Sequence, residues 1–120
     1  MATFNSLSNK QKSKFYKDNY KIWRGGKLKS KGFFIIFNDI EEKNILKKIS
    51  GNALKLYVFL GIHSKNLTGE SWFTVDTIAK YFDKTPRTIG NWVAELEQLN
   101  LIRRMQMKVN GPAHTFLQPY

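Results

Sequence analysis

The amino-acid sequence predicts a mainly α-helical domain of the α+β class that closes with a small β-hairpin. Apolar residues recur at helical spacing in successive segments between residues 51 and 99. After Ile102 they alternate with polar residues, and Asn110-Gly111 supplies a strong hairpin signal. With 120 residues and 42% apolar content, the chain is large enough for one domain with a modest core.

Positive charge is concentrated in the first quarter of the chain. Residues 1–31 hold nine Lys and Arg against Asp18 alone, which gives +8 of the total net charge of +11. Residues 32–120 hold eleven cations against eight acids, which gives only +3. We therefore divide the chain into a basic N-terminal extension, residues 1–31, and a folded domain, residues 32–120. Such a balance favours a polyanionic partner.

The extension combines its cations with aromatic residues. Residues 1–9 look disordered, and a helix is expected from Asn9 to Arg24, stopped by Gly25-Gly26 and followed by a solvated linker. Tyr16, Tyr20 and Trp23 have the i, i+4, i+7 spacing of one helix face. The segment could follow a phosphate backbone, dock its aromatic stripe on a second copy, or do both. The number of aromatic residues favours a dimerising helix whose outer face is basic.

Three short apolar segments follow the extension. The run Phe33–Phe37 predicts a strand, and residues 40–50 predict one short helix that presents Ile45, Leu46 and Ile49. Ser50 then caps a helix over residues 51–66, with Ala53, Leu56, Tyr57 and Leu60 as its core stripe. Residues 66–71 read as a loop, and Trp72-Phe73 as a short strand.

Two helices joined by a tight turn are predicted between residues 74 and 99. Thr74 caps the first helix, which turns Val75, Ile78, Ala79 and Phe82 inward. Thr85 caps the second, and Pro86 occupies its first position, where a missing N–H costs nothing. The second helix directs Ile89, Trp92, Val93, Leu96 and Leu99 inward and Arg87, Thr88, Gly90, Asn91, Glu95 and Gln98 outward. This is a helix-turn-helix arrangement, in which the second helix offers its N-terminal face to a DNA groove.

The pattern Thr85-x-x-Thr88-Ile89-x-x-x-Val93-x-x-Leu96-Glu97-x-x-Asn100-Leu101-Ile102 resembles the recognition helix of winged-helix regulators of the GntR and MarR groups. The resemblance covers residues 50–120 and implies a winged helix-turn-helix fold, with the basic hairpin after Ile102 as the wing. Asn100 stands where those groups usually have Gly, and Asn also tolerates the left-handed conformation of a helix end. Gly90 stands where many relatives carry a basic residue. Residues 33–60 resemble more loosely the N-terminal domains of Gram-positive plasmid replication initiators and DnaD-like proteins.

The candidate DNA-binding residues fall into three groups. In the helix-turn-helix, Lys84 and Thr85 suit phosphates, Arg87 suits guanine and Asn91 suits adenine, with Thr88 and Gly90 beside them. Gly90 has two open interpretations, a close approach to DNA or room for a neighbouring aromatic ring. We expect Trp92 and Trp72 to be core or interface residues, and Met105, Met107 and Val109 to be half-buried in the wing. The other two groups are the wing residues Arg103, Arg104, Lys108 and Asn110 and the N-terminal residues Lys10, Lys12 and Lys14.

These features predict a sequence-specific double-stranded DNA-binding protein, a homodimeric transcriptional repressor of a plasmid or mobile element. A plasmid replication or conjugative-transfer factor is the first alternative, and a protein-interaction winged helix is the second. His63 and His114 have no catalytic partner at a recognisable spacing, and Asp39, Glu41 and Glu42 suit a helix start, so no enzyme, metal, cofactor or small-molecule ligand is expected. The absence of cysteine, of a signal peptide and of a membrane-length apolar run predicts a cytoplasmic protein. The resemblance to Gram-positive plasmid proteins implies that it is bacterial and associated with DNA.

Overall fold

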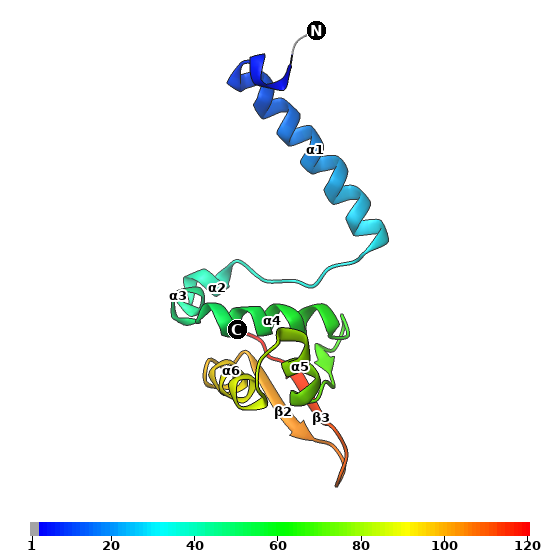
Figure 1. The fold of residues 1–120 in the computed structure, drawn as a ribbon, viewed down its shortest axis with the longest axis vertical. Coiled ribbons are helices and arrows are strands. Elements are labelled where there is room, and N and C mark those ends of the chain that lie inside the picture. The colour runs from blue at the N-terminus through cyan, green and yellow to red at the C-terminus, as the bar shows by residue number, and fades with distance from the viewer. Residues whose placement is uncertain (1–2) are drawn as a thin grey trace. The chain divides into compact units, whose positions relative to one another are not determined.

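A computed structural model describes residues 3–120, and the chain divides into two units between Phe33 and Phe34 (Figure 1). The N-terminal unit holds a short 3₁₀ turn, η1 (Phe4–Ser6), and one long helix, α1 (Asn9–Ser30). The second unit holds five further helices and a three-stranded antiparallel sheet. Every buried apolar side chain of the described residues belongs to this second unit.

The start of α1 is fixed by a capping box. The Ser8 hydroxyl accepts a hydrogen bond from the backbone N–H of Gln11, and the Gln11 side chain accepts one from the N–H of Ser8. Before this cap, the Phe4 ring packs on Phe15 and Tyr16, with ring centroids 5.3 and 5.6 Å apart. The expectation of disorder for residues 1–9 was therefore wrong for residues 3–9, while residues 1–2 lie outside the described part of the chain.

The end of α1 lies six residues beyond the predicted one. The helix continues through Gly25-Gly26 to Ser30, so the predicted stop at Arg24 and the linker that followed were wrong. The N–H groups of Lys31 and Gly32 both bond to the carbonyl of Lys27, and Gly32 has a φ of +74°. Glycine commonly ends a helix by turning left-handed, and neither Gly25 nor Gly26 does so.

The apolar segment at residues 33–37 forms no strand, contrary to the prediction. No neighbouring strand pairs with it, and only Phe34 is half-buried, whereas Phe33, Ile35 and Phe37 are exposed. Phe34 packs against α4 (Gly51–His63), where a Cβ on Gly61 would lie 2.3 Å from its ring. Because Gly61 has no side chain, α4 leaves space there for the Phe34 ring, and we call this space the seat of Phe34.

Two short helices replace the single one predicted for residues 40–50. Helix α2 (Asp39–Glu42) and helix α3 (Ile45–Lys48) are separated by Asn44, whose φ of 61° is left-handed and breaks the helix. Ile49 is buried as predicted and Ile45 is half-buried, but Leu46 is 47% exposed. Ser50 then caps α4 by accepting from the N–H of Ala53, which confirms the predicted start of that helix.

Helices α4, α5 (Val75–Phe82) and α6 (Pro86–Gln98) enclose the core. The predicted inward residues are confirmed, because Leu56, Leu60, Ile78, Ile89 and Leu96 have no exposed surface. Aromatic rings join the three helices, with Phe59 of α4 5.6 Å from Phe82 of α5 and Phe82 5.5 Å from Trp92 of α6. Trp92 is 7% exposed and so is a core residue.

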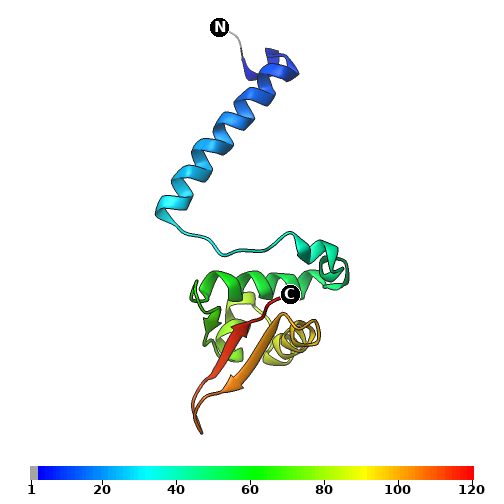
Figure 2. The same cartoon turned by 180° about the vertical axis from the view of Figure 1, so that it is seen from behind.

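The sheet has the order β1-β3-β2, with β1 at Glu70–Ser71, β2 at Ile102–Gln106 and β3 at Ala113–Leu117. The first strand thus lies two residues before the predicted Trp72-Phe73. The hairpin of β2 and β3 projects away from the helices in both views (Figures 1 and 2). Its turn places Asn110 at φ 62° and bonds the N–H of Gly111 to the carbonyl of Lys108. Because this turn lies beyond the core, Met105, Met107 and Val109 are exposed, and the prediction that they are half-buried was wrong.

Candidate nucleic-acid interface

The turn between α5 and α6 is held by hydrogen bonds of its own residues. Asp83 takes the left-handed conformation at φ 54°, which ends α5. Thr85 then caps α6, because its hydroxyl accepts from the N–H of Thr88 at 3.2 Å and contacts the Thr88 hydroxyl at 3.0 Å. Lys84 is exposed beside this cap, next to the N–H group of Arg87, which has no partner within the helix because Pro86 has no N–H and Thr88 and Ile89 donate to Thr85. The role of Thr85 and Thr88 within the structure is therefore to cap α6, and the turn that they form has the geometry of a phosphate-binding helix start.

The outward face of α6 is open along the length of the helix. Arg87, Gly90 and Asn91 lie on it as the sequence predicts, and all three are exposed. A Cβ on Gly90 would meet nothing within 4 Å, so the interpretation that a neighbouring aromatic ring needs this space was wrong. Helical periodicity adds Ala94 and Gln98 to the same face, and both are exposed. Neither was among the predicted site residues, although the periodicity alone places them there.

Glu95 was expected to point outward, but it contacts the start of α4. Its carboxylate accepts from the backbone N–H of Ser50 at 2.7 Å and from the Ser50 hydroxyl at 2.8 Å. A carboxylate is favoured at a helix N-terminus, so this contact ties α6 to α4. It also turns the carboxylate away from the outward face, which carries one cation, two amides and two small residues: Arg87, Asn91, Gln98, Gly90 and Ala94.

The wing residues play different parts in the structure. The Arg103 guanidinium donates to the Glu97 carbonyl at 2.9 Å and to the Asn100 side chain, and so covers the C-terminal end of α6. Arg104 is half-buried and donates to Thr115 at 2.6 Å and to the Phe73 carbonyl at 3.3 Å. Burial lowers the pKa of Arg104, and the nearby Glu97 carboxylate opposes that shift. Lys108 and Asn110 are exposed at the wing tip.

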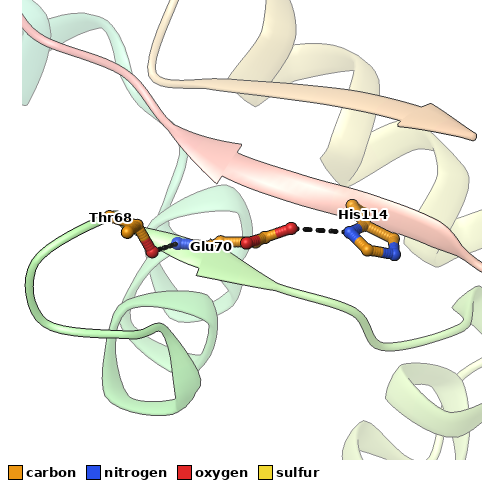
Figure 3. A network of polar contacts seen from close by, with 3 residues as sticks. All are labelled: Thr68, Glu70 and His114. Carbon is orange, nitrogen blue, oxygen red and sulfur yellow. Dashed lines mark hydrogen bonds and ion pairs between the residues drawn. The ribbon is translucent and has the colours of Figure 1, made fainter. Parts of the chain in front are cut away.

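The outer face of the sheet carries a paired histidine that the sequence did not predict. His114 Nδ1 lies 2.6 Å from the Glu70 carboxylate, and the N–H of Glu70 donates to the Thr68 hydroxyl at 3.3 Å (Figure 3). Trp72 packs on His114 with ring centroids 5.5 Å apart and lies under the Lys65 ammonium, while remaining 48% exposed. Trp72 is therefore a surface residue that directly follows β1, and the contact of Glu70 with His114 links β1 to β3.

The N-terminal candidates do not share one face of α1. Lys10 and Lys14 are four residues apart and exposed on the same side. Lys12 lies on another side, where its ammonium is 5.5 Å from the centre of the Phe4 ring. Its cation–π contact helps to hold the segment before the helix.

A family model described as "Helix-turn-helix domain" matches residues 47–102. The match runs from the end of α3 to the start of β2 and includes α4, α5 and α6. Together with the three-stranded sheet, it defines the second unit as a winged helix-turn-helix domain, a class that binds DNA. The match is to the general domain and does not single out the GntR or MarR groups or the replication initiators. Searches of curated proteins and of solved structures found no significant match.

Two further observations concern residues 3–120. No group of three His, Asp or Glu side chains in this part of the chain is placed to hold a metal ion. None of its helices is both long enough and apolar enough to cross a bilayer.

Proposed function

We propose that this protein binds double-stranded DNA in a sequence-specific manner through the outward face of α6. The observation that carries the proposal is the make-up of that face, whose five residues are all exposed and which bears no carboxylate because Glu95 turns to Ser50. Its small residues, Gly90 and Ala94, lie between longer hydrogen-bonding side chains. A helix with such a face fits closely into a major groove.

Four of the five residues of this face have a side chain with a definite chemistry toward base edges. Arg87 matches guanine O6 and N7, whereas the amides of Asn91 and Gln98 match adenine N6 and N7. The Ala94 methyl group suits the thymine methyl group. Lys84 and the cap at Thr85 would bind the neighbouring phosphate, and Lys108 and Asn110 at the wing tip would contact the flank.

Selection of sites from random duplex DNA tests this proposal. We expect a short recovered motif. Arg87→Ala should weaken binding to that motif by ~1–3 kcal/mol and relax preference at one position. Lys55→Ala, a change to an exposed cation of α4, is the matched control and should leave the motif unchanged. A selection that recovers no motif would count against base reading and in favour of a protein-interaction role.

We further propose that the protein acts as a homodimeric transcriptional repressor. The support for dimerisation is the aromatic stripe of α1, where Tyr16, Tyr20 and Trp23 are 56–60% exposed at i, i+4, i+7 spacing. Two such stripes can bury one another and bring two α6 helices onto one repeated site. Sedimentation equilibrium should show a dimer that Tyr16→Ala/Trp23→Ala converts to monomers. A wild-type protein that is monomeric at assay concentrations would exclude this assembly.

A further inference from the structure

A row of cations follows one side of α1 over most of its length. Its five members are separated by four, three, four and three residues, the spacing that keeps side chains on one helix face. All five are exposed, and we call them the basic stripe: Lys10, Lys14, Lys17, Lys21 and Arg24. At 1.5 Å per residue the stripe is ~21 Å long. Neighbouring members lie ~5–6 Å apart.

No side chain of the described residues forms an ion pair with a member of the basic stripe. The close contacts between acidic and basic side chains in residues 3–120 are Lys43 with Asp39 and His114 with Glu70, all in the second unit. Asp18, the one acid of α1, flanks the stripe without forming an ion pair. An unpaired row of five like charges repels itself, and a polyanion that spans the row relieves the repulsion.

The structure assigns to the basic stripe a second, sequence-independent contact with DNA, in which α1 lies along the phosphate backbone. This inference rests on the proposed function, because it takes the partner to be the duplex that α6 reads. This contact differs from binding by a flexible basic tail, because only the cations on one face of α1 contact the phosphates. Lys12 is outside the stripe and is not among them.

An anionic membrane surface fits α1 less well than DNA does. The aromatic face lies about 110° around the helix from the basic stripe, as an interfacial helix would require. However, Lys12 and Lys27 fall in line with Tyr16, Tyr20 and Trp23 on that face. Insertion of this face into a bilayer would carry both ammonium groups toward the acyl chains, which is unfavourable.

Two triple variants of the full chain with equal charge test the inference. The stripe variant is Lys14→Gln/Lys17→Gln/Lys21→Gln, and the matched control is Lys12→Gln/Lys27→Gln/Lys29→Gln, whose members lie off the stripe. Binding to a random 30-base-pair duplex is measured across a salt series. Each phosphate contact contributes about 0.9 to the slope of log affinity against log salt. We expect the stripe variant to lose about 2.7 from the slope and the control to keep the wild-type slope.

The possible results separate the contact from general electrostatics and from the role of α6. Equal losses of slope in both variants would show that only total charge matters, and two unchanged slopes would show that α1 does not touch DNA. Either result overturns the inference. A third result would also overturn it, in favour of a membrane surface: the stripe variant keeps the wild-type slope on DNA but no longer binds phosphatidylserine vesicles.

Two controls complete the experiment. Arg87→Ala should keep the full slope on random DNA, so a failure of base reading by α6 is detected separately from a failure of the contact made by α1. Far-UV circular dichroism verifies that α1 stays helical in both variants.

Discussion

Gly90 and Glu95 are five residues apart on α6 and serve opposite purposes. Gly90 contacts nothing, and an added Cβ would lie in open space. Glu95 accepts two hydrogen bonds from Ser50 and thereby fixes α6 against α4. Burial and hydrogen bonding within the molecule therefore account for a glutamate at position 95. Gly90, in contrast, lowers the stability of α6, and no contact in the structure compensates for that loss.

Gly90→Ala should stabilise the domain and weaken its binding to DNA. Alanine is better than glycine in a helix interior by ~1 kcal/mol, and at Gly90 it meets no neighbour. If the backbone of α6 approaches the DNA at this position, the added methyl group separates the two surfaces. Thermal denaturation should show a higher melting temperature, and a binding isotherm on the selected site a lower affinity. A gain in stability with unchanged affinity would contradict the close approach.

Tyr57 connects the stability of the second unit to alkaline pH. Burial, followed by the neighbouring Tyr120, raises the pKa of Tyr57 from its ordinary value of 10.0 to about 12. The folded state thus holds the phenolic proton at pH values where the unfolded state has released it. The contribution is fully present below pH 10 and is lost as the pH rises from 10 to about 12. We expect urea denaturation to show a smaller fall in unfolding free energy over this range for Tyr57→Phe than for the wild type, and equal falls would refute the linkage.

At the scale of the elements, a prediction from the sequence agrees with the structure where the residues that determine the feature lie within a few positions of it. The start of α6 was predictable because Thr85 and Pro86 act within one turn of the helix. The end of α1 was not, because Gly25-Gly26 stops a helix only if the chain turns left-handed there, and here Gly32 does so instead. Residues 33–37 have β propensity but no partner strand, and propensity alone does not make a strand.

Gly61→Ala should destabilise the second unit through Phe34. The new methyl group would overlap the Phe34 ring, so either the helix is overpacked, at ~1–3 kcal/mol, or the ring leaves its seat on α4. In a Phe34→Ala background the overlap is absent, and the same change should stabilise by up to ~1 kcal/mol through helix propensity. A double-mutant cycle followed by urea denaturation measures this change of sign. An identical effect of Gly61→Ala in both backgrounds would mean that Phe34 does not occupy the seat.

The candidate interface shows the same division between local and distant signals. Helical periodicity placed Arg87, Gly90, Asn91 and Gln98 outward, and the same count would have added Ala94 and completed the face. The part of Arg103 was not predictable, because it requires the carbonyl of Glu97 and the side chain of Asn100 at the end of the preceding helix. Nor was the pair of His114 with Glu70, whose members are 44 residues apart and meet only through the strand register.

At the scale of the whole molecule, hydrophobic burial and positive charge belong to different units. All of the buried apolar residues among those described lie after Phe34, whereas α1 has no buried residue and residues 1–31 supply +8 of the net charge. Stability should therefore depend on the second unit and salt-dependent affinity on the first.

Deletion of residues 1–33 should leave a folded domain of net charge +3. Its thermal transition should remain cooperative, with a midpoint close to that of the full chain, because the deletion removes no buried side chain of the described residues. Its preference among DNA sequences should survive, since phosphate contacts position a protein and base contacts specify the site. Circular dichroism melts and a repeated site selection check both statements. Loss of the cooperative transition would show instead that α1 completes the core.

The open face of α6 has one more consequence, which concerns how such a protein changes over time. Its five residues, Arg87, Gly90, Asn91, Ala94 and Gln98, are exposed, whereas Ile89, Trp92, Val93 and Leu96 on the other side of the helix are buried. If α6 reads DNA as we propose, substitutions on the open face alter what is read while leaving the scaffold intact. A small number of mutations, each nearly neutral for folding, could move the protein to a new target, and the same positions form a ready cassette for laboratory redesign.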